Sequence, residues 1–379
     1  MPATGDRITR RKDGLFQGMY TAQTPDGPKR KYIYGRKKKD VERKLAEARG
    51  DAARGIVFDA GTLTVGQWLD SGLSDGLKPL VDADKMAYST YKRYAGIVGK
   101  HLEPALGHRK LKDLTRVEVR KLYAAKSETL SPRSVDYIHI TLQKALSQAV
   151  RDDLIPRNVA AGERPHSTRH ASPDRVKALS PAQVRALLDA ARGTRNEALY
   201  VVALHTGLRQ GELLGLKWSD LDGSKVSVRR ALKIVDRGLG FGPPKNRASR
   251  RSVPLNQSAA ALRSHKARQN QERIAGREWH DGDLVFPNRL GKPMDPTNLY
   301  SQEYKPLLKR AGLAEHGFTF HALRHTFATA LFARGEHPKK VQSLLGHSSI
   351  TQTMDTYSHL IDDIGGDAVD GLDEVFGSS

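Results

Sequence analysis

Polar side chains that could do chemistry gather in four segments of the C-terminal half of the chain. The segments are ALHTGLRQGELLGLKWSDLD (203–222), GFGPPKNRASRRSVPL (240–255), TFHALRHTFATALFARG (319–335) and LGHSSITQTMDTYSH (345–359). The side chains that we single out in them are Arg209, Glu212, Lys245, His321, Arg324, His347 and Tyr357. The chain has no cysteine, which excludes a thiol nucleophile and Cys-ligated zinc.

This set of residues predicts phosphoryl transfer without a metal ion. A phosphodiester under attack gathers negative charge on its non-bridging oxygens, and fixed Arg and His donors can hold that charge where other enzymes use Mg²⁺. A free tyrosine has a pKa of about 10, so Tyr357 needs nearby cations and a base to act as a nucleophile. The departing sugar oxygen needs a proton donor, a role that suits a mobile lysine such as Lys245. We expect no metal and no other cofactor.

Two of these motifs also have ordinary structural explanations. Arg209 and Glu212 lie three residues apart on one helical face, and a simple ion pair that holds the helix would account for them. Lys245 follows two prolines between the strand-like stretches VSVRRALKIV (226–235) and RSVPL (251–255). This pattern predicts a hairpin with Lys245 at its tip, and an ordinary loop lysine is the alternative.

The third and fourth segments predict helices. His321 and Arg324 are three residues apart and share one helical face. His325 lies one position further round, and we interpret it as a packing or capping histidine. Gly346 occupies the position of a helix C-cap, and a new helix that carries Tyr357 should follow it.

Length and charge limit what kind of protein this is. The chain of 379 residues is long enough for two or three domains, and its formal net charge is +21 with a pI of about 10.0. So basic a chain favours a polyanionic partner, and nucleic acid is the leading candidate. No apolar run is long enough to span a membrane, and the absence of cysteine agrees with a reducing cytoplasm. We therefore expect a cytoplasmic protein that associates with the nucleoid of a bacterial host.

The first 55 residues form the most basic part of the chain, with 15 Lys and Arg against 7 Asp and Glu. The stretches 14–23 and 28–35 predict two strands joined at Thr24-Pro25-Asp26-Gly27, followed by a helix that rests on the sheet. A solvated charged tail is the alternative. The candidate DNA-binding residues of this segment are Lys29, Arg30, Lys31 and Arg36.

Residues 62–160 predict a helical bundle with a basic surface. Thr115 with Glu118 has the form of a capping box, and Ser131-Pro132 supplies an N-cap and an N1 proline. Lys92 and Arg93 are candidate DNA-binding residues on this surface.

Residues 156–176 have the composition of a linker, and another helix should begin after Ser180. The last 20 residues are acidic and keep an apolar set, which favours docking on protein.

Taken together, the motifs resemble those of the tyrosine recombinase family, in particular phage-type integrases. TGLRQGELLGLKW (206–218) resembles the first box of the family, HALRHTFAT (321–329) the second, and LGHSSITQTMDTYSH (345–359) the nucleophile segment. The three boxes stand in the order and spacing of the family, and the resemblance covers nearly the whole chain.

The resemblance implies a role for each site residue. Tyr357 would be the nucleophile that forms a 3′-phosphotyrosyl bond, while Arg209 and Arg324 would clamp the scissile phosphate. His347 would stabilise the transition state through a phosphate oxygen.

Three further roles follow in the same way. His321 would assist proton movement at the tyrosine, and Glu212 would support the pocket. Lys245 matches the family's hairpin lysine, the general acid at the 5′-oxygen, with Arg247 as the nearby rival.

The resemblance also implies an architecture and partners. The expected fold class is multidomain and mainly α with small β-sheets. Residues 1–55 would form an arm-type DNA-binding domain of a β-sheet plus a helix, residues 62–160 a helical, SAM-like core-binding domain, and residues 177–379 a mixed α+β catalytic domain with a C-terminal tail. The partners would be double-stranded DNA attachment sites, three further copies in a homo-tetramer on DNA, an excisionase or directionality factor and a host DNA-bending protein.

The predicted function is site-specific DNA recombination that integrates or excises a phage or another mobile element. A relaxing enzyme similar to type IB topoisomerases, or a telomere-resolving enzyme, would use similar chemistry without pairing two sites. A DNA-binding protein that keeps the fold without chemistry is a third possibility, which the full set of polar site residues disfavours.

Overall fold

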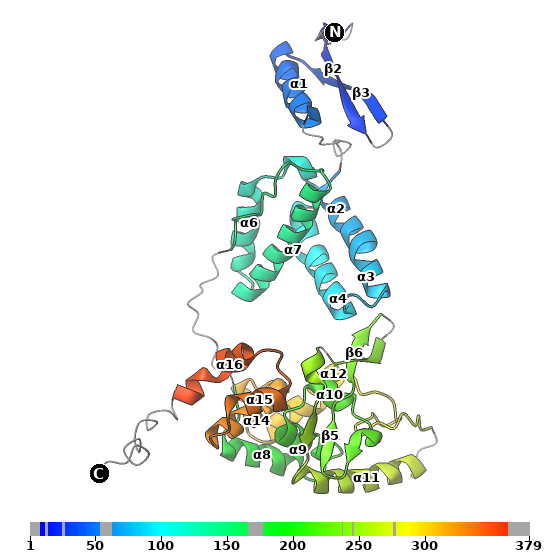
Figure 1. The fold of residues 1–379 in the computed structure, drawn as a ribbon, viewed down its shortest axis with the longest axis vertical. Helices are drawn as coiled ribbons and strands as arrows, with labels where there is room; N and C mark the ends of the chain where they lie inside the picture. The colour runs from blue at the N-terminus through cyan, green and yellow to red at the C-terminus, as the bar shows by residue number, and fades with distance from the viewer. Residues whose placement is uncertain are drawn as a thin grey trace, which may run out of the picture. The chain divides into compact units, whose positions relative to one another are not determined.

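The computed structural model describes residues 8–11, 14–24, 27–53, 63–165, 177–236, 238–244, 246–275 and 278–362. The chain divides into two compact units, residues 1–171 and 172–379, and each is described by itself below. Lys245 and the acidic segment 363–379 lie outside the described residues. Figure 1 shows small sheets among many helices, the predicted fold class.

The chain begins with a three-stranded antiparallel sheet of order β1-β2-β3. Its strands are β1 (Thr9–Arg10), β2 (Phe16–Thr24) and β3 (Gly27–Gly35), followed by helix α1 (Lys38–Ala53). Val41 and Leu45 of α1 are buried against the sheet, and a Cβ at Gly18 of β2 would lie only 3.1 Å from Val41. The predicted hairpin and the helix on the sheet are therefore confirmed.

The rest of the first unit is helical. Its helices are α2 (Val65–Ser71), α3 (Lys78–Asp82), α4 (Tyr88–Ile97), α5 (Glu103–Leu106), α6 (Arg116–Ser127) and α7 (Pro132–Arg151), with π-helical turns at Gly72–Leu77 and Val98–Leu102 and a 3-10 turn at Leu111–Asp113. Both hydrogen bonds of the predicted capping box form, because the Thr115 side chain accepts from the backbone of Glu118 and Glu118 accepts from the backbone of Thr115. Helix α7 begins at Pro132 after the N-cap Ser131, as predicted.

The second unit consists of nine described helices and five described strands. The helices are α8 (Pro181–Ala191), α9 (Glu197–Thr206), α10 (Gln210–Leu214), α11 (Ser258–Ala275), α12 (Pro296–Asn298), α13 (Lys305–Arg310), α14 (His321–Ala333), α15 (Pro338–Leu345) and α16 (Ile350–Asp362). The strands are β4 (Leu221–Asp222), β5 (Lys225–Ser227), β6 (Ala231–Val235), β7 (Gly238–Gly242) and β8 (Ser252–Pro254). A π-helical turn spans Leu299–Tyr304, and 3-10 turns span Trp218–Asp220, Arg247–Ser249 and Ala314–His316.

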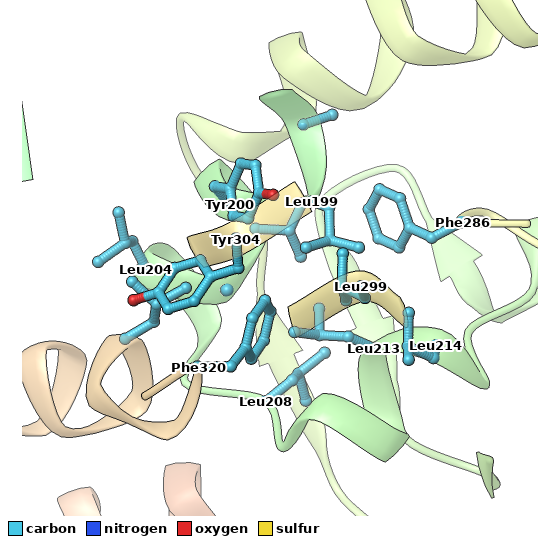
Figure 2. Close-up of a cluster of buried hydrophobic side chains, with 14 of the residues drawn as sticks. Leu199, Tyr200, Leu204, Leu208, Leu213, Leu214, Phe286, Leu299, Tyr304 and Phe320 are labelled. Carbon is cyan, nitrogen blue, oxygen red and sulfur yellow. The ribbon is translucent and has the colours of Figure 1, made fainter. Parts of the chain in front are cut away.

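The core of this unit forms around α9, which is apolar on most of its surface. Leu199 and Tyr200 of α9 meet Tyr304 and Phe320 from the elements that follow (Figure 2). The ring centroids of Tyr304 and Phe320 lie 5.4 Å apart at a steep angle, a favourable edge-to-face arrangement. This core fixes both ends of the segment from α9 to α10, which carries Arg209.

The strand pairing follows the predicted hairpin in part. The stretch 226–235 divides into β5 and β6, and β5 pairs antiparallel with β8 of the stretch 251–255, with Val226 opposite Val253. Between these two strands, β6 pairs with the glycine-rich β7 in a hairpin that we did not predict. Lys245, the predicted tip residue, lies outside the described residues.

Candidate active site

Glu212 holds two arginines from different parts of the chain. Its Oε1 accepts from Nη1 of Arg209 at 2.9 Å, and its Oε2 accepts from Nη2 of Arg251 at 3.0 Å. Oε2 also accepts from the backbone N–H of Arg209 at 3.0 Å. The carboxylate therefore holds Arg209 through both its backbone and its guanidinium. Burial alone would raise the pKa of Glu212, but the charges and hydrogen bonds of the two arginines outweigh it and lower that pKa.

Arg209 and Arg324 converge on one turn of the chain. Arg324, buried on α14, donates to the carbonyls of Leu345 at 2.6 Å and Gly207 at 2.7 Å. Arg209, half-buried before α10, donates to the carbonyl of Gly346 at 3.1 Å. The two guanidinium groups thus contact consecutive carbonyls. Burial, together with the charges of Arg209 and Arg251, lowers the pKa of Arg324 to about 9.

His347 follows that turn directly. Gly346 ends α15 with φ of 65°, a left-handed C-cap as predicted, and an added Cβ there would lie 2.9 Å from Arg251. The His347 ring is buried, with Nδ1 2.9 Å from the hydroxyl of Thr353 on α16. Burial, then the charges of nearby arginines, lowers the pKa of His347 to about 3. The ring is therefore neutral at pH 7 and keeps one N–H donor.

Tyr357 lies on α16, which packs on α14 and α15 (Figure 1). Its side chain is only 1% exposed, and its ring centroid lies 5.6 Å from that of Phe332. The hydroxyl is 2.7 Å from Nδ1 of His325. Burial raises the pKa of Tyr357 to about 12, although the charge of Arg324 lowers it in part.

His325, which we predicted to be a packing or capping residue, has its Nδ1 at the hydroxyl of Tyr357. His321 packs edge-on against His325, with ring centroids 4.6 Å apart. His321 is exposed to solvent, and no hydrogen bond joins it to Tyr357 among the described contacts. Burial by the surrounding protein, together with the charges of His321 and Arg324, lowers the pKa of His325 to about 4.

Comparisons with known proteins agree with this arrangement. Residues 177–363 match the Phage integrase family and residues 83–127 match the Phage integrase, N-terminal SAM-like domain. A tyrosine recombinase XerC-like protein of Caldanaerobacter subterraneus is 30% identical over 372 residues, which cover 92% of each chain. The chain belongs to the tyrosine recombinase family. An integrase of Streptomyces ambofaciens is 34% identical over 335 residues, covering 85% of this chain and 83% of the relative.

Solved structures show the same fold. The integrase of the Tn1549 transposon, in complex with a circular intermediate DNA, superposes with a TM-score of 0.63 at 22% identity and covers 80% of this chain and 100% of its own. A lambda integrase tetramer bound to a Holliday junction gives a TM-score of 0.55 at 19% identity, over 91% of this chain and 96% of that one. The predicted family and fold class are confirmed. The chain is a tyrosine-type site-specific DNA recombinase, and the topoisomerase-like and non-catalytic alternatives are not favoured.

Arg251 is the main site residue of this recombinase that sequence reasoning missed. Its guanidinium is 6% exposed and donates to the carbonyl of Leu344 at 2.5 Å as well as to Glu212. A signal was present in the alternation of RSVPL, which puts Arg251 on the same side as Val253 and Leu255. Both of those residues are buried, so Arg251 points inward too.

The predicted general acid cannot be placed. Lys245 lies outside the described residues, and so does the side chain of its rival, Arg247. Among the described residues, no cluster of three His, Asp or Glu side chains could hold a metal ion.

The predicted DNA-binding residues lie on exposed surface where they are described. Arg30, Arg36, Lys92 and Arg93 are exposed, while the side chains of Lys29 and Lys31 lie outside the described part. The guanidinium of Arg93 lies 4.8 Å from the ring centroid of Tyr137. Within the described part of the recombinase, no helix is long and apolar enough to cross a membrane.

Proposed function

We propose that this recombinase is an integrase that cuts and rejoins DNA through a 3′-phosphotyrosyl bond to Tyr357 and thereby integrates or excises a phage or another mobile element. One observation carries the proposal. Arg209 and Arg324, 115 positions apart in the numbering, meet on consecutive carbonyls beside His347, within the helical cluster that holds Tyr357.

The two arginines are suited to clamp the scissile phosphate. Each guanidinium has five N–H donors, and the carbonyls and Glu212 take only part of them. The remaining donors can bind non-bridging oxygens, and charge that is fixed before the reaction stabilises the transition state most. Neutral His347 would add one further N–H donor to a phosphate oxygen. Glu212 would keep Arg209 in position.

Proton transfer would complete the reaction. Lys245 would donate a proton to the departing 5′-oxygen, as the resemblance implies, and His321 would assist proton movement near the tyrosine. Because the phosphotyrosyl bond conserves the energy of the phosphodiester, a free 5′-hydroxyl can later reverse the step on the same or another strand. No nucleotide cofactor is then needed.

The other parts of the chain would position the DNA. Residues 1–55 would bind accessory arm sites, and residues 62–160 would bind the core site together with the catalytic domain, residues 177–379. Four copies would act on paired attachment sites, with an excisionase or directionality factor and a host DNA-bending protein as further partners. Such an enzyme would work at the nucleoid in the cytoplasm of a bacterial host.

The test is a suicide DNA substrate that traps the covalent intermediate. Tyr357→Phe should bind the DNA within about twofold of the wild type and yield no covalent adduct, because only the reacting oxygen is lost. Adduct yield is read on denaturing gels, and binding by mobility shift. A covalent adduct that persists in Tyr357→Phe would remove Tyr357 from the mechanism.

A further inference from the structure

The hydroxyl of Tyr357 has a basic partner within the protein itself. Its oxygen lies 2.7 Å from Nδ1 of His325, and the ring centroids are 5.8 Å apart at 61°. Among the described residues, His325 is the one side chain that hydrogen-bonds to this oxygen. Any proton that leaves Tyr357 in this arrangement therefore has His325 as its nearest acceptor.

The direction of this hydrogen bond follows from the two protonation states. Burial and neighbouring cations hold the pKa of His325 near 4, and burial holds the pKa of Tyr357 near 12. At pH 7 the imidazole is neutral and the phenol keeps its proton, so the phenol donates and Nδ1 accepts. A neutral imidazole with Nδ1 as the acceptor carries its own proton on Nε2.

Helix α14 carries both Arg324, one of the two arginines proposed to bind the phosphate, and His325, the acceptor. Arg324 and His325 are consecutive residues, and Arg324 reaches the turn before His347 while His325 reaches Tyr357 on α16. Phe332, about two helical turns further along α14, packs against the Tyr357 ring. A single rigid element thus sets the distance between a bound phosphate and the base.

We propose that His325 is a catalytic residue that accepts the proton of Tyr357 as the phenolic oxygen attacks phosphorus; this inference rests on the proposed function. The Tyr357 oxygen–phosphorus bond forms and the bond from phosphorus to the 5′-oxygen breaks. The phenolic proton moves to Nδ1 of His325, and the 5′-oxygen receives its proton from the general acid. In rejoining, the protonated imidazole returns its proton to the tyrosine oxygen as that oxygen leaves.

The charges around His325 change in the required direction when DNA binds. The groups that act on it are His321 and Arg324 from α14 and Tyr357 from α16, and both His321 and Arg324 lower its pKa. Helices α9 and α15 also pack on α14, and their described buried residues include no charged side chain. A phosphate bound at Arg324 adds negative charge, which favours the imidazolium.

The experiment uses the full-length protein and a suicide substrate with a sulfur atom in place of the bridging 5′-oxygen. A thiolate leaves without a general acid, so the single-turnover rate of adduct formation reports the attack step alone. His325→Asn keeps a hydrogen-bond acceptor but cannot take the proton, and His325→Phe keeps the ring volume without the acceptor. His205→Asn, a half-buried histidine of α9 whose Nδ1 contacts its own helix, is the matched control.

We expect both His325 variants to form adduct at least about 100-fold more slowly than the wild type, with DNA binding within twofold of the wild type. The wild-type rate should rise with pH as the His325 imidazole loses its proton and becomes able to act as a base. This rise should disappear in His325→Asn, while His205→Asn keeps the wild-type rate and profile. A merely structural hydrogen bond would leave the profile of His325→Asn unchanged. A wild-type rate and profile in His325→Asn would overturn the proposal, as would a flat profile in His321→Asn alone.

Failure of this inference can be told from failure of the proposed function. Absence of adduct in the wild type, or its presence in Tyr357→Phe, contradicts the function itself. Normal adduct in the wild type together with an unaltered His325→Asn contradicts only the role of His325. The thermal unfolding midpoint is measured for each variant, and if His325→Phe does not fold, the pH profile of His325→Asn decides.

Discussion

At the residue scale, the site is a crowded group of cations with a single described carboxylate partner. Arg209 and Arg251 share Glu212, whereas the hydrogen bonds of buried Arg324 within the described residues go to two backbone carbonyls. Burial followed by repulsion from Arg209 and Arg251 lowers the pKa of Arg324. The site therefore has positive charge that is not neutralised, and a bound phosphate relieves the repulsion.

The histidines near Tyr357 make the native state sensitive to acid. The pKa of His325 is about 4 and that of His347 about 3, both below the unfolded value near 6.5. Between these values the unfolded chain binds protons that the native protein does not, so the free energy of unfolding falls as the pH falls. We predict a loss of about 1 kcal/mol per histidine between pH 7 and pH 5.5, measured by urea unfolding.

Carboxylates stay ionised between pH 7 and pH 5.5, so the change in the free energy of unfolding over this range comes from the histidines. His347→Gln should reduce this pH dependence by the contribution of one histidine, about 1 kcal/mol between pH 7 and pH 5.5. Equal free energies of unfolding at pH 7 and pH 5.5 in the wild type would show that these histidines can be protonated in the folded state.

At the element scale, Arg251 joins three elements around the site. From the start of β8 it bonds to Glu212 on α10 and to the carbonyl of Leu344 in α15. Arg251→Met would leave Glu212 buried with Arg209 as its one charged partner. We predict a loss of about 3–5 kcal/mol in the free energy of unfolding, as is usual when one member of a buried ion pair is removed. Denaturant unfolding of the full-length protein measures it.

The neighbouring residue provides the control. Arg250 is exposed, and Arg250→Met removes the same charge from the surface next to Arg251. It should change the free energy of unfolding by less than about 0.5 kcal/mol. If both variants lose the same amount, Arg251 contributes only its charge, and the contacts to Glu212 and Leu344 do not stabilise the fold.

Local chemistry explains which elements could be predicted. Thr115 with Glu118, and Ser180 with Gln183, form both bonds of a capping box because all the atoms lie within one turn. The C-cap at Gly346 follows from the φ that only glycine adopts easily. The three sequence boxes of the site were identified because they resemble those of the tyrosine recombinase family, and local chemistry alone would not have singled them out.

Contacts between distant segments explain what could not be predicted. The hairpin of β6 and β7 was not predicted, because the glycine-rich β7 has too little strand propensity to reveal its pairing with β6. His325 and Tyr357 lie 32 residues apart, and the packing of α16 on α14 sets their contact. Helical spacing placed His325 beside His321 but could not identify its partner.

At the scale of the whole molecule, the most basic segment of the chain and the candidate active site lie in different parts of the sequence. The first 55 residues carry 15 Lys and Arg against 7 Asp and Glu, although the described residues of the candidate site all lie after residue 200. Arg30 and Arg36 are exposed on and after β3, and α1 covers the sheet through Val41 and Leu45. This small core is the basis for our proposal that residues 1–55 form a separate arm-binding module.

Removing residues 1–55 should therefore separate binding from chemistry. We predict weaker binding to accessory arm sites and a smaller dependence of affinity on salt, because each lost phosphate contact lowers the slope of log K against log salt by about one. Adduct formation on a core-site suicide substrate should stay within a few fold. A full-length protein with Arg30→Gln and Arg36→Gln is the control, and its salt slope should fall by up to about two. An unchanged slope in the truncated protein would mean that the counterions are released at the core-binding and catalytic surfaces instead.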